Sequence, residues 1–524
     1  MQGTKRVNIL QIQLIRFTFC QNRVNVGGNL TRISLLRMVI TMVNQVDCLI
    51  SGGLLVTGQG VERADIVIKD GIIIEISREI KEIQASRTID AHNKYVLPGA
   101  IDAHCHPVYA DKMDTMSLCA AYGGITTLIP FIGNNKAWGY SGRTDDVVKR
   151  FIEDSLRDSL LDFAVHGIFT VADCDTVERS VPALIKMGVT SFKMYMAYSR
   201  RGMQIPDETI VTVMDLAAKD GGITMVHAET GCCIDYLIDM FIAEGKVQPQ
   251  YFLPSQPSLL EMEAVTRVAT FSAVTGCPLY PVHLSAKETP PVLNYFKELD
   301  KAPLFGETCP HYLTLTNDLV LDQGNLAKCG PPLRESEDNK AMWEAVANGL
   351  ISTVASDSCN LSAAMKKTGG MTSQVPSADK EYEETFNIFE GSFGLNTIEF
   401  MVPVVWSRGV NTGLITLPRL VHVLCENPAK IFGLYPQKGA LAVGSDADVV
   451  IWDPSKQHTV TRPHGNGDFT SFEGFELLGM PVLVMQRGNS IIEDGEVIGK
   501  PGRARFLRSD PNVSAYAQKG YKVI

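Results

Sequence analysis

The chain has 524 residues, of which 45% are hydrophobic and 20% charged, and its formal net charge is −10 at pH 7. This length accommodates one large domain, or one large domain with a small one. The acidic balance excludes nucleic-acid binding that depends on electrostatic attraction to phosphates. No apolar run reaches the roughly 18 residues needed to span a bilayer, so we expect no membrane association.

Twelve cysteines are scattered along the chain and form no CxxC motif. The sequence therefore indicates neither a zinc ribbon nor a redox pair. Cys232 and Cys233 are adjacent, and adjacent cysteines rarely bond each other. Reduced thiols in a cytoplasmic protein are the simplest interpretation.

Residues 1–46 form a leader with six basic residues and no Asp or Glu. An Arg-rich segment without acidic residues is typical of a transit peptide. The alternative, which we favour, is an N-terminal extension that precedes a start at Met42, because the sequence after Met42 already has the pattern of folded protein.

Both ends of the remaining chain are rich in short β-type runs. The first, VDCLISGGLLVTGQGVERADIVIKDGIIIEI, is interrupted by Gly and Asp-Gly turns, which is typical of hairpins. A similar pattern returns in GALAVGSDADVVIWDP and VLVMQRGNSIIEDGEVIG. We predict one small β-sandwich built from residues 47–98 and 438–505, followed by a C-terminal tail at 506–524.

The centre, residues 99–437, alternates buried strands with helical stretches, which predicts an α/β fold with a parallel sheet. The helical stretches include VPALIKMG and DETIVTVMDLAAKDG, with apolar residues at helical spacing. Eight strand–helix units fit a closed (β/α)8 barrel, a TIM-like barrel, better than an open sheet. The candidate strands are 95–106, 124–131, 161–170, 191–197, 222–229, 278–286, 302–310 and 351–357.

Polar side chains capable of binding metal occur at the ends of these strands, where barrels of this kind place their active sites. The first strand ends in His104 and His106, and the alternation of side chains along a strand puts both on one face. A single histidine at a strand end is usually structural, and this is our expectation for His166 and His422. The ordered set indicates a metal site instead, and imidazoles suit Zn²⁺. Its later members are Lys193, His227, His283 and Asp357.

Lys193 needs a separate explanation, because a protonated amine repels a cation. Carboxylation by CO2 converts the amine into an anionic carbamate with two oxygens, one for each of two metal ions. The alternative is that Lys193 is a structural ion-pair partner.

The residues named above lie within strings that resemble the dihydropyrimidinase/hydantoinase family of the amidohydrolase superfamily. The resemblance runs in order from about residue 47 to 505. Its strings are LPGAIDAHCH, SFKMYMAY, VHAETG, PVHLSA, ETCPHYL, GPPLR, ASD, ENPAKIFGLYPQKGALAVGSDADVVIWDP and GKPGRARF.

The resemblance implies a binuclear metal-dependent hydrolase with two divalent ions, most simply Zn²⁺. It assigns the second metal to His227 and His283, and the bridge between the metals to N6-carboxylated Lys193. The more buried metal would be bound by His104, His106 and Asp357.

The resemblance also implies the chemistry. A hydroxide held between two metals attacks the ring amide carbon. Tyr198 donates a hydrogen bond to the substrate carbonyl, Gly330 contacts the substrate through its backbone, and Asp357 carries the proton to the leaving nitrogen. A dihydropyrimidine or hydantoin then opens to an N-carbamoyl amino acid. A cytoplasmic homotetramer follows from the same resemblance.

Four departures from the family pattern affect the substrate pocket. The stretch PVYADKMDTMSLCAAYGG after the first metal motif is shorter than usual, and Gly330 replaces a serine. Ser358 stands where histidine is common, and Ser392 and Phe393 fall in a segment that does not align. We therefore expect a pocket of different shape.

Other activities compete with this interpretation. The nearest alternatives are a related allantoinase, dihydroorotase or imidase. Dihydroorotate and allantoate-type substrates carry extra polar or anionic groups, so an arginine in the pocket would favour them. Arg200 and Arg201 follow Tyr198, but we expect both to be solvated at the surface. A non-catalytic scaffold of the same family is disfavoured, because every metal-ligand position is filled.

Overall fold

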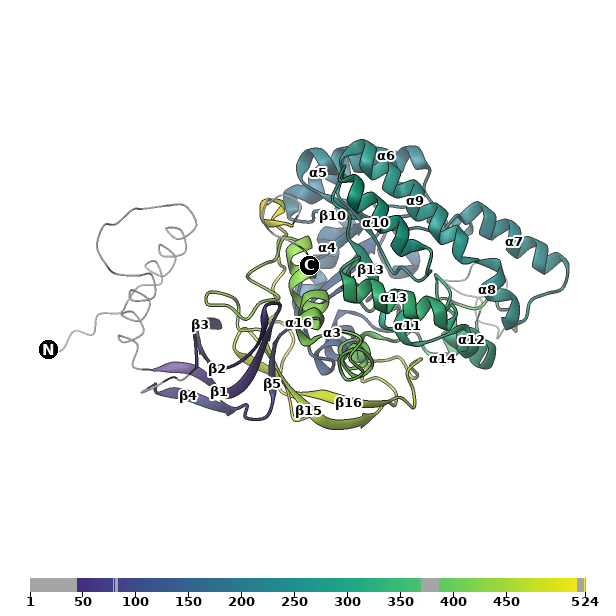
Figure 1. The fold of residues 1–524 in the computed structure, drawn as a ribbon. Helices are drawn as coiled ribbons and strands as arrows, with labels where there is room; N and C mark the ends of the chain where they lie inside the picture. The colour runs from purple at the N-terminus through teal and green to yellow at the C-terminus, as the bar shows by residue number, and fades with distance from the viewer. Residues whose placement is uncertain (1–44, 79, 81–82, 369–385, 516–522, 524) are drawn as a thin grey trace.

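The computed structural model describes residues 45–78, 80, 83–368, 386–515 and 523. The predicted leader up to residue 44, with Met42, and most of the segment after residue 515 lie outside the described residues. Figure 1 shows two parts: strands from both ends of the chain lie side by side, and helices surround a second set of strands formed by the middle of the chain.

The first part is a nine-stranded sheet that combines both ends of the chain. β5 joins the two ends, because it pairs antiparallel with β15 and parallel with β1. The hairpins expected from the Gly and Asp-Gly turns are present, and the small β domain built from both ends is confirmed. The strands are β1 Val46–Thr57, β2 Gly60–Lys69, β3 Ile72–Ser77, β4 Ala85–Asp90, β5 Tyr95–Pro98, β15 Val449–Thr459, β16 Glu476–Gln486, β17 Asn489–Glu493 and β18 Glu496–Val497.

The second part is the predicted (β/α)8 barrel, and its strands are parallel. Bridges from Leu279 to Leu304 and from Cys105 to Ser358 connect its two groups of strands, β6–β12 and β13–β14, into a closed ring. The third predicted strand is divided into two short pieces, β8 and β9. The strands are β6 Ala100–Cys105, β7 Ile125–Gly133, β8 Asp162–Phe163, β9 His166–Ile168, β10 Ser191–Tyr195, β11 Ile223–His227, β12 Leu279–Pro281, β13 Gly306–Thr308 and β14 Ile351–Val354.

Helices cover the barrel and bury one apolar stripe each. In α5, Val177, Val181 and Leu184 are buried at helical spacing, and Gly188 ends the helix with a φ of 91°. No helix of the described residues is both long and apolar enough to cross a membrane. The main barrel helices are α3 Met113–Tyr122, α4 Thr144–Asp158, α5 Val177–Met187, α6 Asp207–Asp220, α7 Gly231–Ala243, α9 Ser258–Thr275, α10 Thr289–Leu299, α13 Ser336–Asn348, α15 Met401–Val405, α16 Leu417–Val421 and α17 Asn427–Ile431.

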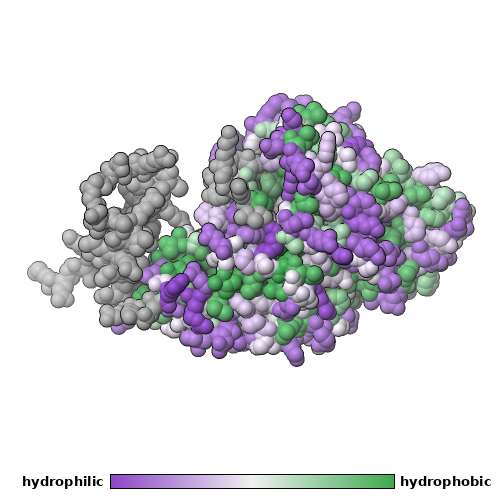
Figure 2. Space-filling view, viewed as in Figure 1, coloured by the Kyte–Doolittle hydropathy of each residue, from purple (hydrophilic) through white to green (hydrophobic). Residues whose placement is uncertain are grey.

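Shorter helices extend the loops on the side of the barrel where the strands end. On the face seen in Figure 2, hydrophilic and hydrophobic residues are interspersed. These shorter helices are α8 Phe252–Ser255, α11 Pro310–Thr314, α12 Asn317–Gln323 and α14 Ala363–Lys367.

Candidate active site

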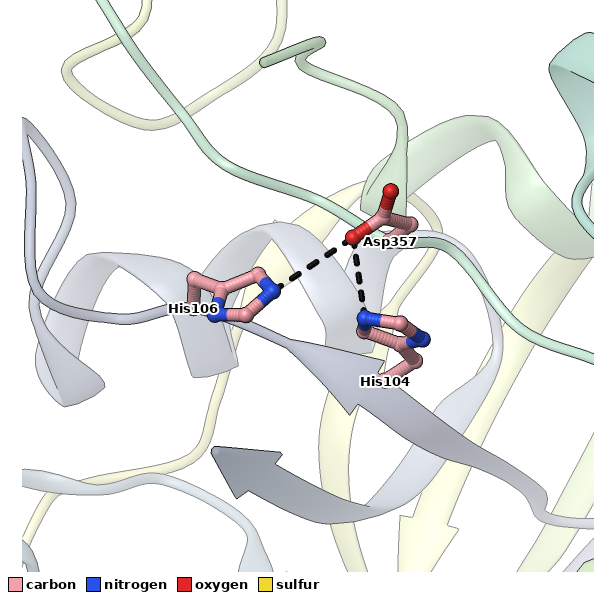
Figure 3. Close-up of side chains that lie close together, drawn as sticks. All are labelled: His104, His106 and Asp357. Atoms are coloured by element: carbon pink, nitrogen blue, oxygen red, sulfur yellow. Dashed lines mark ion pairs between the residues drawn. The ribbon is translucent and has the colours of Figure 1, made fainter. Parts of the chain in front are cut away.

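The first group of predicted ligands converges at the end of β6. Figure 3 shows His104 and His106 directed at one carboxylate oxygen of Asp357. Asp357 Oδ1 lies 3.0 Å from His104 Nε2 and 3.4 Å from His106 Nε2. The ligand atoms of all three lie within 4.8 Å of one another, so the group could hold a metal ion.

The start of the loop after β14 is anchored to β6, and this places Asp357. Ser356 donates hydrogen bonds from its backbone and its hydroxyl to the buried carboxylate of Asp102, over 2.9 and 2.6 Å. Two strands that are 254 residues apart in the chain are thereby held in register at the site.

His227 and His283 form the second group of predicted ligands. His227 is the last residue of β11, and its Nδ1 lies 2.9 Å from His283 Nε2. His227 Nε2 lies 2.8 Å from Glu229 Oε2. A hydrogen bond donated to Glu229 leaves the Nδ1 lone pair of His227 facing His283, as in a ligand prepared for a cation. The rings of His283 and His104 are 5.4 Å apart, so the two groups are neighbours.

Glu307 orients His104, a role that sequence reasoning missed. Its carboxylate accepts hydrogen bonds from His104 Nδ1 over 2.6 Å and from the backbone N–H of His283 over 3.0 Å. Burial acts to lower the pKa of His104, but the carboxylates of Glu307 and Asp357 outweigh it and raise the pKa to about 9. The surroundings therefore favour positive charge at this point, which fits a metal cation. An acidic residue in the buried strand β13 was the available signal.

Lys193 lies on β10 with 1% of its surface exposed. Its Nζ lies 4.9 Å from the ring centre of Phe131 and 5.2 Å from that of Tyr195. In the described part of the chain no carboxylate forms an ion pair with Lys193. This differs from the alternative in which Lys193 is a structural ion-pair partner. Burial lowers the pKa of Lys193 to about 8, which favours the neutral amine.

Three site residues have left-handed backbone conformations that non-glycine residues rarely adopt. The φ angles are 69° at Tyr198, 42° at His283 and 45° at Asp357. Such conformations cost about 1–3 kcal/mol each and persist where the surrounding structure holds them. Here they turn the chain directly after the strands, where the side chains meet.

Tyr198 and Gly330 are in close contact. A Cβ on residue 330 would lie closer than 3.0 Å to the Tyr198 hydroxyl oxygen, so the missing side chain makes room for the phenol. The Tyr198 ring lies 4.6 Å from the ring of His227. Burial raises the pKa of Tyr198 well above its usual value, so the hydroxyl stays protonated and able to donate.

All the predicted site residues line one cavity of about 70 Å³. Its other walls are mainly aromatic and apolar, apart from two polar side chains that sequence reasoning did not place there, Arg201 and His311. Neither ring nitrogen of His311 has a hydrogen-bond partner among the described residues, and burial lowers its pKa to about 4. His311 comes shortly after β13, so it lies at the end of a barrel strand, as the predicted metal ligands do. The additional lining residues include Tyr109, Trp138, Met203, Phe393 and Leu395.

The residues at which the chain departs from the family pattern lie in different surroundings. Phe393 lines the cavity, whereas the Ser392 hydroxyl donates to the Thr368 carbonyl over 3.3 Å. The Ser358 hydroxyl accepts hydrogen bonds from the backbone N–H groups of residues 397 and 398 and has a structural role. Near the stretch that follows β6, Trp138 Nε1 donates to the Tyr109 hydroxyl over 3.1 Å, and this aromatic pair forms one wall.

The two histidines expected to be structural do not line the cavity. His166 is fully buried, with Nδ1 2.5 Å from the Ser191 hydroxyl and Nε2 3.1 Å from the Ala103 carbonyl. His422 lies 4.0 Å from Glu426. Both agree with the expectation.

Comparison with known proteins shows similarity to amidohydrolases along almost the whole chain. Residues 95–491 match the model of the amidohydrolase family. A D-hydantoinase of Ralstonia pickettii is 36% identical over 475 residues, covering 88% of this chain and 98% of that protein. A dihydropyrimidinase structure from Brevibacillus agri has a TM-score of 0.81 at 29% identity, covering 90% and 99%. An L-hydantoinase (dihydropyrimidinase) structure from Arthrobacter aurescens has a TM-score of 0.79 at 31% identity, covering 88% and 100%.

Proposed function

We propose that this protein opens a cyclic amide by hydrolysis and uses two divalent metal ions to do so. The chain belongs to the amidohydrolase family and to its hydantoinase branch. The observation that carries the proposal is the convergence of four imidazoles, one carboxylate and one buried lysine on a single cavity. Imidazole and carboxylate together suit zinc. The relatives named as hydantoinases and dihydropyrimidinases support the class of substrate.

Under this proposal each group of side chains holds one ion. His104, His106 and Asp357 bind the first, and His227 and His283 bind the second. Bound cations of this kind lower the pKa of a water molecule, so that hydroxide is available at neutral pH.

The bridge between the two groups is N6-carboxylated Lys193. The neutral amine of Lys193 attacks CO2 and loses a proton, which gives a carbamate with one negative charge. Its pKa of about 8 supports this step, because a useful fraction of the amine is neutral near neutral pH.

Asp357 and Tyr198 carry out the proton transfer and the charge stabilisation. Asp357 accepts the proton of the attacking water and delivers it to the ring nitrogen as the C–N bond breaks. Tyr198 donates a hydrogen bond to the carbonyl oxygen as negative charge develops on it. The backbone of Gly330 contacts the substrate beside the phenol. Hydantoins and dihydropyrimidines give N-carbamoyl amino acids.

The experiment is a turnover assay of the zinc-loaded protein with dihydrouracil, hydantoin, aryl-hydantoins, allantoin, dihydroorotate and succinimide. We expect ring opening of hydantoins or dihydrouracil, measured as the N-carbamoyl product. Opening of allantoin or dihydroorotate alone would move the chain to a sister activity. Absence of turnover with two zinc ions bound would contradict the proposal.

A cytoplasmic homotetramer is part of the same proposal. All eleven cysteines of the described residues are free thiols, which supports a reducing compartment. Light scattering of the purified protein measures the number of subunits, and a monomer would contradict the tetramer.

A further inference from the structure

The two consecutive arginines that follow Tyr198 have different surroundings. Arg200 Nη2 lies 2.7 Å from Asp239 Oδ1, and its Nε lies 3.5 Å from Asp235 Oδ1. Arg201 has no ion pair with any described residue, and its Nε is buried without a hydrogen-bond partner. The expectation of surface solvation is therefore wrong for Arg201, which lines the active-site cavity.

The turn after Tyr198 positions the Arg201 side chain. The left-handed conformation of Tyr198 begins a short 3₁₀ turn, Ser199–Arg201, in which the Arg201 N–H donates to the Tyr198 carbonyl over 3.1 Å. The guanidinium carbon then lies 4.9 Å from the centre of the Tyr198 ring. That ring is also 4.6 Å from His227, so the cation lies one aromatic ring away from the predicted metal ligands.

A guanidinium in this position lacks the partner that its chemistry prefers. Its planar N–H groups match the two oxygens of a carboxylate, and such pairs are stronger away from bulk water. The cavity walls from Tyr109, Tyr195 and Met203 offer no negative charge. The Asp357 carboxylate also lines the cavity, but it faces His104 and His106. The cavity is therefore complementary to a ligand that brings its own anion.

We propose that Arg201 binds a carboxylate on the ring substituent of the substrate, so that the preferred cyclic amide carries a short acidic side chain. This inference rests on the proposed function. In the proposed function the Tyr198 hydroxyl donates to the substrate carbonyl, and the ring of the same tyrosine contacts Arg201. The carboxylate would therefore be carried by a substituent on the ring atom next to that carbonyl. Such a compound combines a neutral cyclic amide ring with one terminal anion.

The test uses two hydantoins of the same size, 5-(2-carboxyethyl)hydantoin and its neutral amide, 5-(2-carbamoylethyl)hydantoin. We expect the zinc-loaded protein to prefer the acid in kcat/KM by about 10- to 100-fold, the range of a charge-assisted hydrogen-bonded pair. Arg201→Gln should bring this ratio close to one. Arg200→Gln, the matched control, should keep the ratio of the unmodified protein.

Calorimetric binding of both compounds to the same three proteins separates this inference from the proposed function. If the unmodified protein binds the acid more tightly than the amide and Arg201→Gln loses that preference, the anion site is supported. This holds even if neither ring is opened, because the absence of ring opening would contradict only the proposed function. The role of Arg201 is overturned if the unmodified protein opens both compounds with an acid-to-amide ratio of kcat/KM near one, or if this ratio is the same in Arg201→Gln and Arg200→Gln. Neither result would contradict the proposed hydrolase activity.

Discussion

Glu307 Oε1 lies 2.6 Å from His104 Nδ1, and neither side chain is exposed. The carboxylate lies on β13 and the imidazole on β6, 203 residues apart in the chain. A hydrogen bond from Nδ1 fixes the histidine tautomer and leaves Nε2 directed at Asp357. The partner of a proposed metal ligand thus comes from a strand that no local pattern connects with it.

Replacing Glu307 with Gln should weaken zinc binding by about 10–100-fold, because the carboxylate no longer orients the histidine or increases its basicity. Titration against a zinc-binding dye measures the affinity. Glu298→Gln, at an exposed position on α10, is the matched control. Equal affinities in both variants would remove Glu307 from the support of the site.

Lys193→Ala should remove the bridge between the metals and lower activity by more than about 100-fold, since losing an outer partner alone costs about 10–100-fold. The intact protein should carry the additional mass of one CO2, and the variant should lack it. Short carboxylic acids added to the variant should restore part of the activity. Full activity with two bound metals in Lys193→Ala would contradict carboxylation.

The rate of carboxylation should depend on pH in a direction set by Lys193. At fixed dissolved CO2, reactivation of metal-free protein by zinc should rise about tenfold per pH unit while the amine is mostly protonated. The rise should level off above about pH 8, where the pKa of Lys193 lies. A rate that continues to rise toward pH 10 would show an ordinary, solvated lysine.

Gly330→Ala should displace the Tyr198 hydroxyl, because the new Cβ would lie closer than 3.0 Å to it. Tyr198→Phe should lower kcat by about 10²–10³-fold through loss of an oxyanion donor. We expect Gly330→Ala to lower kcat by at least about tenfold in the unmodified protein and by much less in Tyr198→Phe, because contacting residues show strong coupling. Independent effects in the double variant would exclude the contact.

Asp357→Asn should abolish turnover while keeping the shape of the side chain, because the amide cannot accept the proton of the attacking water. The measurement pairs kcat with zinc content, so that loss of metal is distinguished from loss of the proton carrier. An active variant would assign the proton transfer to another group, and His311 is the neighbouring candidate.

The sequence by itself determined which residues end the barrel strands and in what order. Strand periodicity put His104 and His106 on one face, and the strand-end rule selected Lys193, His227 and Asp357. The turns at both ends of the chain predicted the small β domain. These features are local, so they can be read from neighbouring residues, and the resemblance to the hydantoinase family is confirmed by the comparisons.

Only the tertiary structure decided which side chains face one another across the barrel. Glu307 contacts His104, and Gly330 makes room for the Tyr198 hydroxyl. Both contacts depend on closure of the barrel and on turns that are distant in the chain. Two neighbouring arginines look equivalent in the sequence, yet Arg200 meets the acidic residues of α7 and Arg201 lines the cavity. The physical reason is that a backbone turn of a few residues sets the direction of each side chain, while its partner is supplied by a strand or helix far away in the chain.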